Sequence, residues 1–191
     1  MNQATLWQRF KEGDKNSLKI IYEEHIDALF LFGKKLCSDE ELVLDYIHDL
    51  FVYVWENREK LGEPVVIRAY LLKSLRNRII DDFRKSKKIN ISPDISLVKD
   101  TELSKEEEWV AFETSAQINE KLGGAIKLLT DRQREIIYLK FNQNLSYEEI
   151  GDILGINYQS VRNLAHRAIS ELRKNMMVLL IILSTLLVIS W

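Results

Sequence analysis

Apolar positions at helical spacing run through the first half of the chain. From Ser17 to Leu36, apolar side chains such as Leu18 and Ile21 recur near the helical period, which predicts an amphipathic helix. A second helix is expected after Ser38, because this N-cap residue type is followed three positions later by Glu41. The apolar face of this second helix comprises Ile47, Leu50, Phe51, Val54 and Trp55.

A third helix follows a break in the pattern. Gly62 and Pro64 end the second helix, since the residue before a proline resists helical geometry. The next helix is expected from Val65 to Lys85. Its inward-facing side chains are Leu71, Leu72, Leu75, Ile79 and Phe83. Three helices with short connections suffice for one compact bundle.

The rest of the chain predicts a second helical domain. Residues 86–101 contain Pro93 with several Ser and Asp residues and no helical period, so they read as a linker. Helical character resumes near Ser104 and is interrupted at Gly123 and Gly124. Because no segment alternates as a strand would, we predict an all-α fold. Its parts are domains at 1–86 and 104–174, a linker at 87–103 and an apolar C-terminal helix at 175–191.

Residues 147–166 have the spacing of a DNA-binding helix-turn-helix. Gly151 is small where the two helices would cross, and Gly155 suits the tight turn because a positive φ costs glycine little. Ser146 and Glu149 form a predicted capping box for the first helix, and Asn157 suits the N-cap of the second. The apolar positions of the motif are Ile150, Leu154, Ile156, Val161 and Leu164.

Polar side chains of the second helix of this motif remain off the packed face. Arginine can fork a guanine, and asparagine or glutamine can pair with adenine. A helical hairpin with a purely structural role is the alternative. The residues predicted to contact DNA are Asn157, Tyr158, Gln159, Arg162, Asn163, His166 and Arg167.

The distribution of charge favours a polyanion partner. The net charge of −2 excludes a wholly basic protein that coats nucleic acid and an acidic disordered tail. Residues 66–88 nevertheless carry a net charge of +6 and residues 156–174 one of +3, whereas the intervening 89–125 carry −5. Basic stripes on a balanced protein are typical of a nucleic-acid site, although solvated helix faces give the same pattern.

The sequence has no recognisable catalytic or metal-binding motif. The single cysteine, Cys37, and the absence of an apolar N-terminal segment predict a cytoplasmic protein. His25, His48 and His166 are far apart, so we expect no metal and no cofactor. The sequence has no glycine-rich phosphate loop and no nucleophile elbow. We therefore expect a protein that is not an enzyme.

Four blocks of sequence lie at 45–55, 70–84, 129–141 and in the helix-turn-helix through Arg173. Together they resemble the extracytoplasmic-function (group IV) sigma factors of bacterial RNA polymerase. The resemblance runs from about Asn16 to Lys174. Within the second block, Asn77, Asp81 and Arg84 match spaced residues of the family. Gly151 stands where relatives commonly have alanine, a change that we expect to conserve size at the helix crossing.

The resemblance implies that 1–86 is sigma region 2, which binds core polymerase and the minus-ten promoter element. The loop 61–67 with Tyr70 and Asn77 would form a pocket for a base pulled from the stack. The implied polymerase contacts are His48, Asp49, Val52, Tyr53 and Glu56. The implied contacts to minus-ten DNA are Arg68, Tyr70, Lys73, Arg76, Asn77, Asp81, Arg84 and Lys85.

The resemblance also implies the other partners. Residues 104–174 would be sigma region 4, docking its second motif helix on the minus-thirty-five element, and the acidic linker would occupy the polymerase channel that later carries RNA. Expected partners are promoter DNA, the largest and flap-bearing polymerase subunits and an anti-sigma factor. Three alternatives stay open: a stand-alone helix-turn-helix regulator, a membrane-tethered adaptor, and a sigma factor whose promoter choice is delegated to a separate DNA-binding partner.

The apolar tail at 176–191 has only Ser184, Thr185 and Ser190 as polar breaks. As a helix it would be about 24 Å long, shorter than the roughly 30 Å hydrocarbon core of a bilayer. Three interpretations follow: a short membrane anchor, a docking helix for a protein partner, or a segment packed on the protein's own core. We expect the tail to be dispensable for polymerase and DNA binding.

Overall fold

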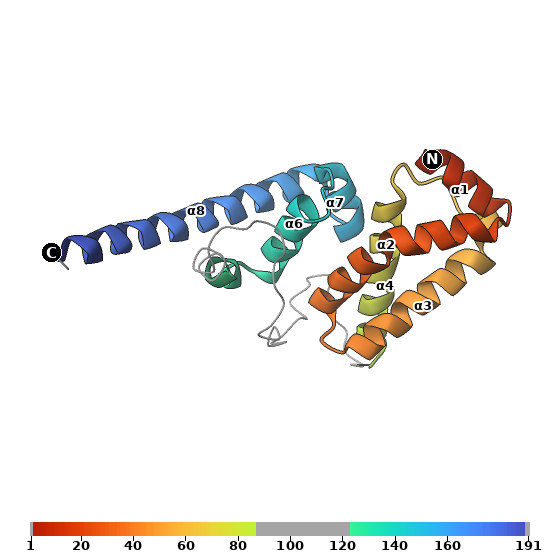
Figure 1. Cartoon of the computed structure of the whole chain (residues 1–191), viewed down its shortest axis with the longest axis horizontal. Coiled ribbons are helices and arrows are strands. Elements are labelled where there is room, and N and C mark those ends of the chain that lie inside the picture. Colours follow the sequence, from red (N-terminus) through yellow and green to blue (C-terminus); the bar gives the residue numbers. More distant parts are fainter. Residues whose placement is uncertain (1, 87–122, 190–191) are drawn as a thin grey trace. The chain divides into compact units, whose positions relative to one another are not determined.

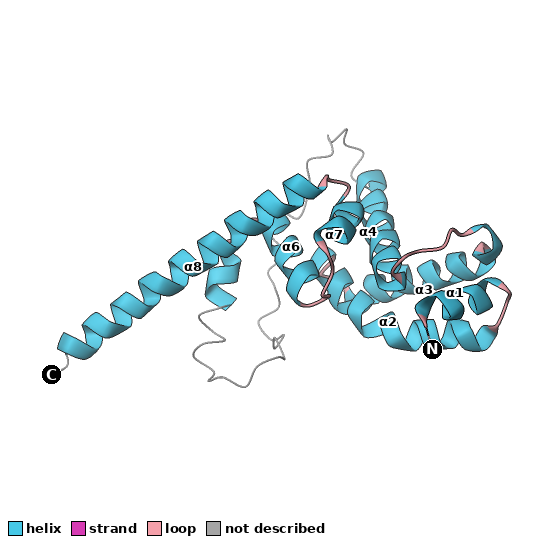
Figure 2. Cartoon of the chain, turned by 90° about the horizontal axis from the view of Figure 1, so that it is seen from above, coloured by secondary structure: helices cyan, strands magenta, loops and turns pink. Residues whose placement is uncertain are grey.

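Helices account for the regular structure of both units of the protein (Figures 1 and 2). The computed structural model describes residues 2–86 and 123–189, without the side chains of Ser86 and of 176–189. These parts contain no strand, so the predicted all-α fold is confirmed. The linker predicted at 87–103 and the start of the second predicted domain lie outside the described residues, and the domain boundaries stay predictions.

The first unit contains four α-helices and one short 3-10 helix. They are α1 (Gln3–Lys11), α2 (Lys15–Leu36), α3 (Glu40–Glu56), η1 (Arg58–Lys60) and α4 (Ile67–Ser86). Helices α2, α3 and α4 are the three predicted helices, whereas α1 was not predicted. The N-cap of α3 is Asp39, whose carboxylate accepts from the Leu42 amide at 3.1 Å, and not the expected Ser38. A carboxylate is a good cap because it also complements the positive end of the helix dipole.

The core of the first unit joins α2, α3 and α4. Helix α2 contributes Ile21, Leu29 and Phe32, and these residues are almost completely buried. The inward residues of α4 are buried as predicted except Phe83, which is half-buried. Trp55 is also only half-buried, and the Arg58 guanidinium lies 4.7 Å from the centre of its ring.

The second unit contains a helical turn at 123–127 and three longer helices. These are α6 (Asp131–Phe141), α7 (Tyr147–Leu154) and α8 (Tyr158–Ile189). Gly123 and Gly124, predicted as an interruption, are the first described residues of the helical turn, and what precedes them lies outside the description. Leu129, Ile137 and Ala168 form a buried cluster against which Ile169 and Leu172 pack.

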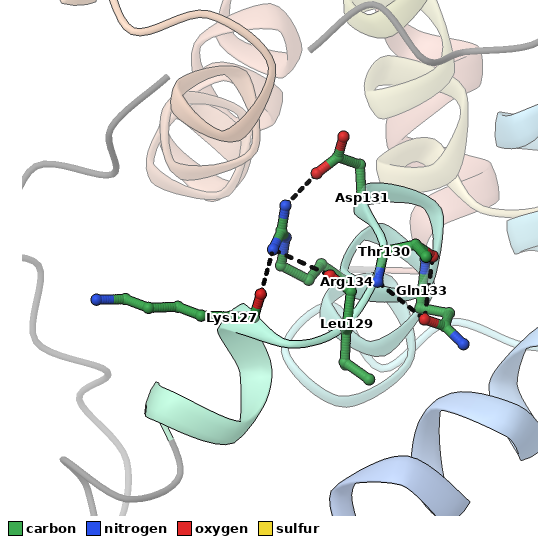
Figure 3. A network of polar contacts seen from close by, with 6 residues as sticks. All are labelled: Lys127, Leu129, Thr130, Asp131, Gln133 and Arg134. Carbon is green, nitrogen blue, oxygen red and sulfur yellow. Dashed lines mark hydrogen bonds and ion pairs between the residues drawn. The ribbon is translucent and has the colours of Figure 1, made fainter. Parts of the chain in front are cut away.

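Polar contacts hold the start of α6 against the preceding turn (Figure 3). Thr130 and Gln133 form a capping box, and Thr130 donates its amide to Gln133 Oε1 at 2.9 Å. Arg134 pairs with Asp131 and donates to the carbonyls of Lys127 and Leu129 at 3.2 and 3.1 Å. Arg134 therefore satisfies the Lys127 carbonyl at the end of the short helical turn and the Leu129 carbonyl in the link that precedes α6.

Candidate nucleic-acid interface

The helix-turn-helix is formed by α7, the turn 155–157 and the first part of α8. Ile150, Val161 and Ala165 are buried between its helices as the motif requires, while Ile156 and Leu164 are half-buried. This packed stripe determines which side of α8 remains available to a ligand.

Both predicted caps of the motif are confirmed. Ser146 donates its amide to Glu149 Oε2 at 2.6 Å, and the Glu149 amide donates to Ser146 Oγ at 3.2 Å. Asn157 Oδ1 accepts from the Ser160 amide at 2.8 Å. The start of α8 is thus fixed by a residue that is also a predicted DNA contact.

The turn allows little space at Gly151. Gly155 has a φ of +67°, and the Ile156 amide donates to the Gly151 carbonyl at 3.0 Å, an arrangement typical of a Schellman helix end. A Cβ on Gly151 would lie 2.7 Å from the Ile156 carbonyl oxygen. The expectation that glycine and alanine are equivalent here is therefore wrong for this structure.

All seven residues predicted to read DNA are exposed: Asn157 caps α8, and the other six lie on its first turns. Gln159 Nε2 donates to Asn163 Oδ1 at 3.1 Å, so these two amides are already aligned with one another. The Tyr158 ring packs edge-on against Tyr147 at 6.1 Å between ring centres. The exposed Arg162 and Arg167 add positive charge to the same helix.

The face of α3 opposite the core stripe carries the five predicted polymerase contacts, and all five are exposed. Arg78 of α4 lies beside this face, 3.7 Å from the Asp49 carboxylate and 5.9 Å from the centre of the Tyr53 ring. Arg78 was not among the predicted site residues, although its charge belongs to the basic segment 66–88. Two of the predicted contacts are therefore held by a neighbour on α4.

The predicted minus-ten contacts on α4 divide into exposed and buried residues. Lys73, Asn77, Asp81, Arg84 and Lys85 are exposed, and the first four are spaced three or four residues apart on one helix face. A second group is less accessible: Arg68 and Tyr70 are half-buried, and Arg76 is only 4% exposed.

Burial of Arg76 corrects one site prediction. Its side chain lies on the same stripe as Leu72, Leu75 and Ile79, which are fully buried. A guanidinium in that position does not reach the phosphates of a strand bound at the surface. We therefore omit Arg76 from the proposed site.

The two adjacent aspartates of α4 have different partners. Asp81 pairs with Arg84 at 3.6 Å, as expected for neighbours on one helix. Asp82 instead accepts a 2.5 Å hydrogen bond from the Tyr46 hydroxyl of α3. Burial and this carboxylate raise the pKa of Tyr46, so the hydroxyl remains a donor that joins α3 to α4.

The predicted base pocket lies in the loop between η1 and α4. Its Val65 is 96% exposed, and Tyr70 stands one helical turn into α4. Burial raises the pKa of Tyr70, which keeps its hydroxyl neutral. Two side chains of α1 also contact this region: Trp7 Nε1 donates to the Gly62 carbonyl at 2.9 Å, and Gln3 Oε1 accepts from the Ile67 amide at 3.5 Å.

Among the described residues, no group of three or more His, Cys, Asp or Glu side chains could hold a metal ion.

Two family models match the chain. The model of Sigma-70 region 2 matches residues 21–89, and the model of Sigma-70, region 4 matches residues 125–174. The second match includes the complete helix-turn-helix, and the first includes α3, the loop and α4.

Curated relatives cover most of the chain. RNA polymerase sigma factor SigZ of Bacillus subtilis is 26% identical over 174 residues, which is 91% of this chain and 86% of the relative. ECF RNA polymerase sigma factor SigW of the same organism is 26% identical over 184 residues, which is 88% of this chain and 94% of the relative.

Solved structures share the fold at lower identity. CnrH, in complex with the cytosolic domain of CnrY, has a TM-score of 0.60 at 18% identity and covers 92% of this chain and 97% of its own. The sigma factor RpoE, in complex with the anti-sigma factor NepR from Bartonella quintana, has a TM-score of 0.57 at 21% identity, with coverages of 84% and 96%.

Proposed function

The chain belongs to the sigma-70 family of RNA polymerase sigma factors, as a member of the extracytoplasmic-function type that recognises promoters and initiates transcription, and we propose how its residues divide this task. The exposed face of α8 reads the minus-thirty-five element. The first unit binds core polymerase and captures a base of the melted minus-ten element.

The proposal for α8 rests on one observation: the motif packs a single stripe of this helix and exposes every predicted DNA contact. In such motifs the N-terminal part of the second helix contacts base edges in the major groove. Arg162, Gln159 and Asn163 have the side chains for bidentate base contacts. The exposed Arg167 is placed one turn further along and suits a phosphate.

The proposal for core polymerase rests on the exposed face of α3. Val52 and Tyr53 are 40% and 48% exposed and adjacent in sequence, so they place apolar surface on the same side of α3 as the predicted polar contacts. The acidic Asp49 and Glu56 frame this apolar centre. We assign this face to the largest subunit of core polymerase, with region 4 binding the flap-bearing subunit.

The proposal for promoter opening rests on the exposed stripe of α4. Lys73, Arg84 and Lys85 provide positive charge for strand phosphates, which makes binding salt-dependent. Asn77 lies on the same stripe with an amide that suits an unpaired base edge. Extrusion of a base costs a few kcal/mol, which its contacts in a pocket offset.

An anti-sigma factor is the proposed regulatory partner. The solved structure of RpoE, which shares this fold, contains the anti-sigma factor NepR, and we extend this kind of partner to the present chain. Promoter selection through a separate DNA-binding partner remains a prediction. Among rival functions, a stand-alone regulator does not account for the region 2 match at 21–89.

The role of the apolar tail also stays a prediction. Helix α8 continues without interruption from the helix-turn-helix to Ile189, so the tail extends the DNA-reading helix instead of forming a separate element. Within the described residues, no helix is long and apolar enough to cross a membrane. Truncation after Asn175 should leave initiation on core polymerase unchanged while it alters partner capture or membrane fractionation in cells. A truncated chain that unfolds would place the tail in the protein's core.

Transcription reconstituted with core polymerase tests the proposed function. The wild-type chain should confer initiation on bare core enzyme, which neither a stand-alone regulator nor an adaptor would do. Asn77→Ala should impair opening of a duplex promoter more than use of a pre-melted bubble, while polymerase association stays intact. Asn16→Ala, which removes an exposed amide from α2 of the same unit, is the matched control. Equal defects of Asn77→Ala on both templates would mean that Asn77 serves the fold or the pocket itself.

A further inference from the structure

Helix α1 holds both ends of the loop that precedes α4. At the first end, the indole of Trp7 donates to the Gly62 carbonyl at 2.9 Å. At the second end, the side chain of Gln3 accepts from the Ile67 amide at 3.5 Å. Ile67 is the first residue of α4, so Gln3 acts as a distant cap for a helix start.

The loop has few restraints of its own. Among the described residues, the amides of Gly62, Glu63 and Val65 donate no backbone hydrogen bond, and Pro64 has no amide hydrogen. The loop conformation therefore depends on the chain that packs against it. The contacts from α1 supply that restraint.

Trp7 also fixes Tyr70 behind the loop. The two rings pack edge to face, with centres 5.5 Å apart and planes at 70°. Trp7 is only 2% exposed and also packs on Phe10 at 5.0 Å, while Phe10 lies 6.2 Å from Trp55. The indole of Trp7 is thus held in place by an aromatic cluster. Its contacts with the Gly62 carbonyl and the Tyr70 ring in turn restrict the movement of both.

We propose that Trp7 and Gln3 are positioning residues for promoter opening, which hold the loop 61–66 and Tyr70 in the arrangement that receives an unstacked base. The inference rests on the proposed function of this loop. Helix α1 lies outside the residues matched by the region 2 model, which begin at 21. A pocket ordered before the base arrives avoids an ordering cost at the moment of capture.

The decisive comparison uses Gln3, because its side chain is exposed and its removal leaves the core intact. Gln3→Ala removes the acceptor for the Ile67 amide, whereas Gln3→Glu keeps an oxygen there and adds a charge suited to the start of α4. Gln8→Ala is the matched control, since the Gln8 amide on the same helix donates to Glu12 and not to the loop. Each full-length variant is assembled with core polymerase.

Gln3→Ala should raise amide hydrogen exchange across the loop and slow opening of a duplex promoter by roughly two- to fivefold, the range for one weak hydrogen bond. Gln3→Glu should restore both properties, and Gln8→Ala should match wild type. Trp7→Phe, which keeps an aromatic ring but loses the donor to Gly62, should slow opening more than Phe10→Leu does at equal stability.

Two results would overturn the inference and leave the proposed pocket intact, and a third would overturn both. If loop exchange rises in Gln3→Ala while opening keeps its wild-type rate and Asn77→Ala is defective, α1 is only structural and the pocket stands. If Gln3→Ala and Gln8→Ala are equally slow, general loss of α1 explains the defect. If Asn77→Ala itself opens the duplex at the wild-type rate, the pocket assignment fails and takes this inference with it.

Discussion

Gly33 of α2 lies against Val43 of α3, with no space for a Cβ between them. A Cβ built on Gly33 would lie 2.5 Å from Val43 Cγ1, whereas Cγ2 and Cβ of Val43 would be at 3.5 and 3.6 Å. Val43 is fully buried, and its β-branched side chain has little rotamer freedom. The added methyl group of Gly33→Ala therefore meets one rigid atom.

Two opposing effects decide the stability of Gly33→Ala. Alanine gains about 0.5–1 kcal/mol over glycine inside a helix. Overpacking of a filled core costs about 1–3 kcal/mol, and the single very short contact puts this case in the upper half of that range. We expect a net loss of about 1–2 kcal/mol in the free energy of unfolding.

Removal of Val43 Cγ1 should turn Gly33→Ala from a destabilising into a stabilising substitution. In a Val43→Ala background only the Cβ of residue 43 remains near the new methyl group, at an ordinary contact distance of 3.6 Å. Gly33→Ala should then stabilise the protein by about 0.5–1 kcal/mol, because the helix gain is no longer opposed. The coupling energy between the two sites should be about 2–3 kcal/mol in favour of the double variant.

Urea unfolding followed by circular dichroism measures all four members of this cycle. The slope with denaturant should stay constant across them, so that differences in midpoint report stability. Destabilisation by Gly33→Ala of equal size in both backgrounds would refute the argument. The close approach of α2 and α3 would then not limit the residue at position 33.

Three further predictions concern the DNA interface, the first core and the turn of the motif. Arg162→Ala should weaken binding to the specific promoter duplex by about 1–3 kcal/mol if the Arg162 guanidinium forks a guanine. Arg173→Ala, the control, should not change specificity. If Arg162→Ala loses as much affinity for a random duplex, Arg162 is a phosphate contact. Burial, with help from the Arg68 charge, lowers the pKa of His25 below its ordinary 6.5, so the unfolded chain binds a proton first as pH falls. Stability should accordingly decrease below about pH 6.5 by at most about 1.4 kcal/mol per pH unit, and His25→Gln, but not the exposed His48→Gln, should remove that component in denaturation curves. Gly151→Ala should destabilise the second unit by about 1–2 kcal/mol in hydrogen exchange, and a stabilised motif would show that the turn can move away from the Ile156 carbonyl.

Local patterns in the sequence were sufficient for the elements that depend on neighbours within one or two helical turns. The Ser146 and Glu149 capping box and the Asn157 cap involve residues three positions apart, and both were predicted and confirmed. The exposed face of α8 follows in the same way, because helical spacing alone separates Val161 and Ala165 from the polar positions. The spacing of Arg76 to Leu72 and Ile79 also predicts its burial, whereas its charge alone favours an exposed position.

Only the tertiary structure decided the contacts between distant segments. Helix α1 is short, and the contacts of its Trp7 are with Gly62 and Tyr70, which lie more than fifty residues further along the chain. Local patterns around Trp7 therefore could not predict them. Spacing along one helix likewise says nothing of the close approach between Gly33 and Val43 or of the carbonyl beside Gly151. A periodic pattern specifies which face of a helix is buried, whereas the partner and the space left for a side chain depend on how the helices pack together.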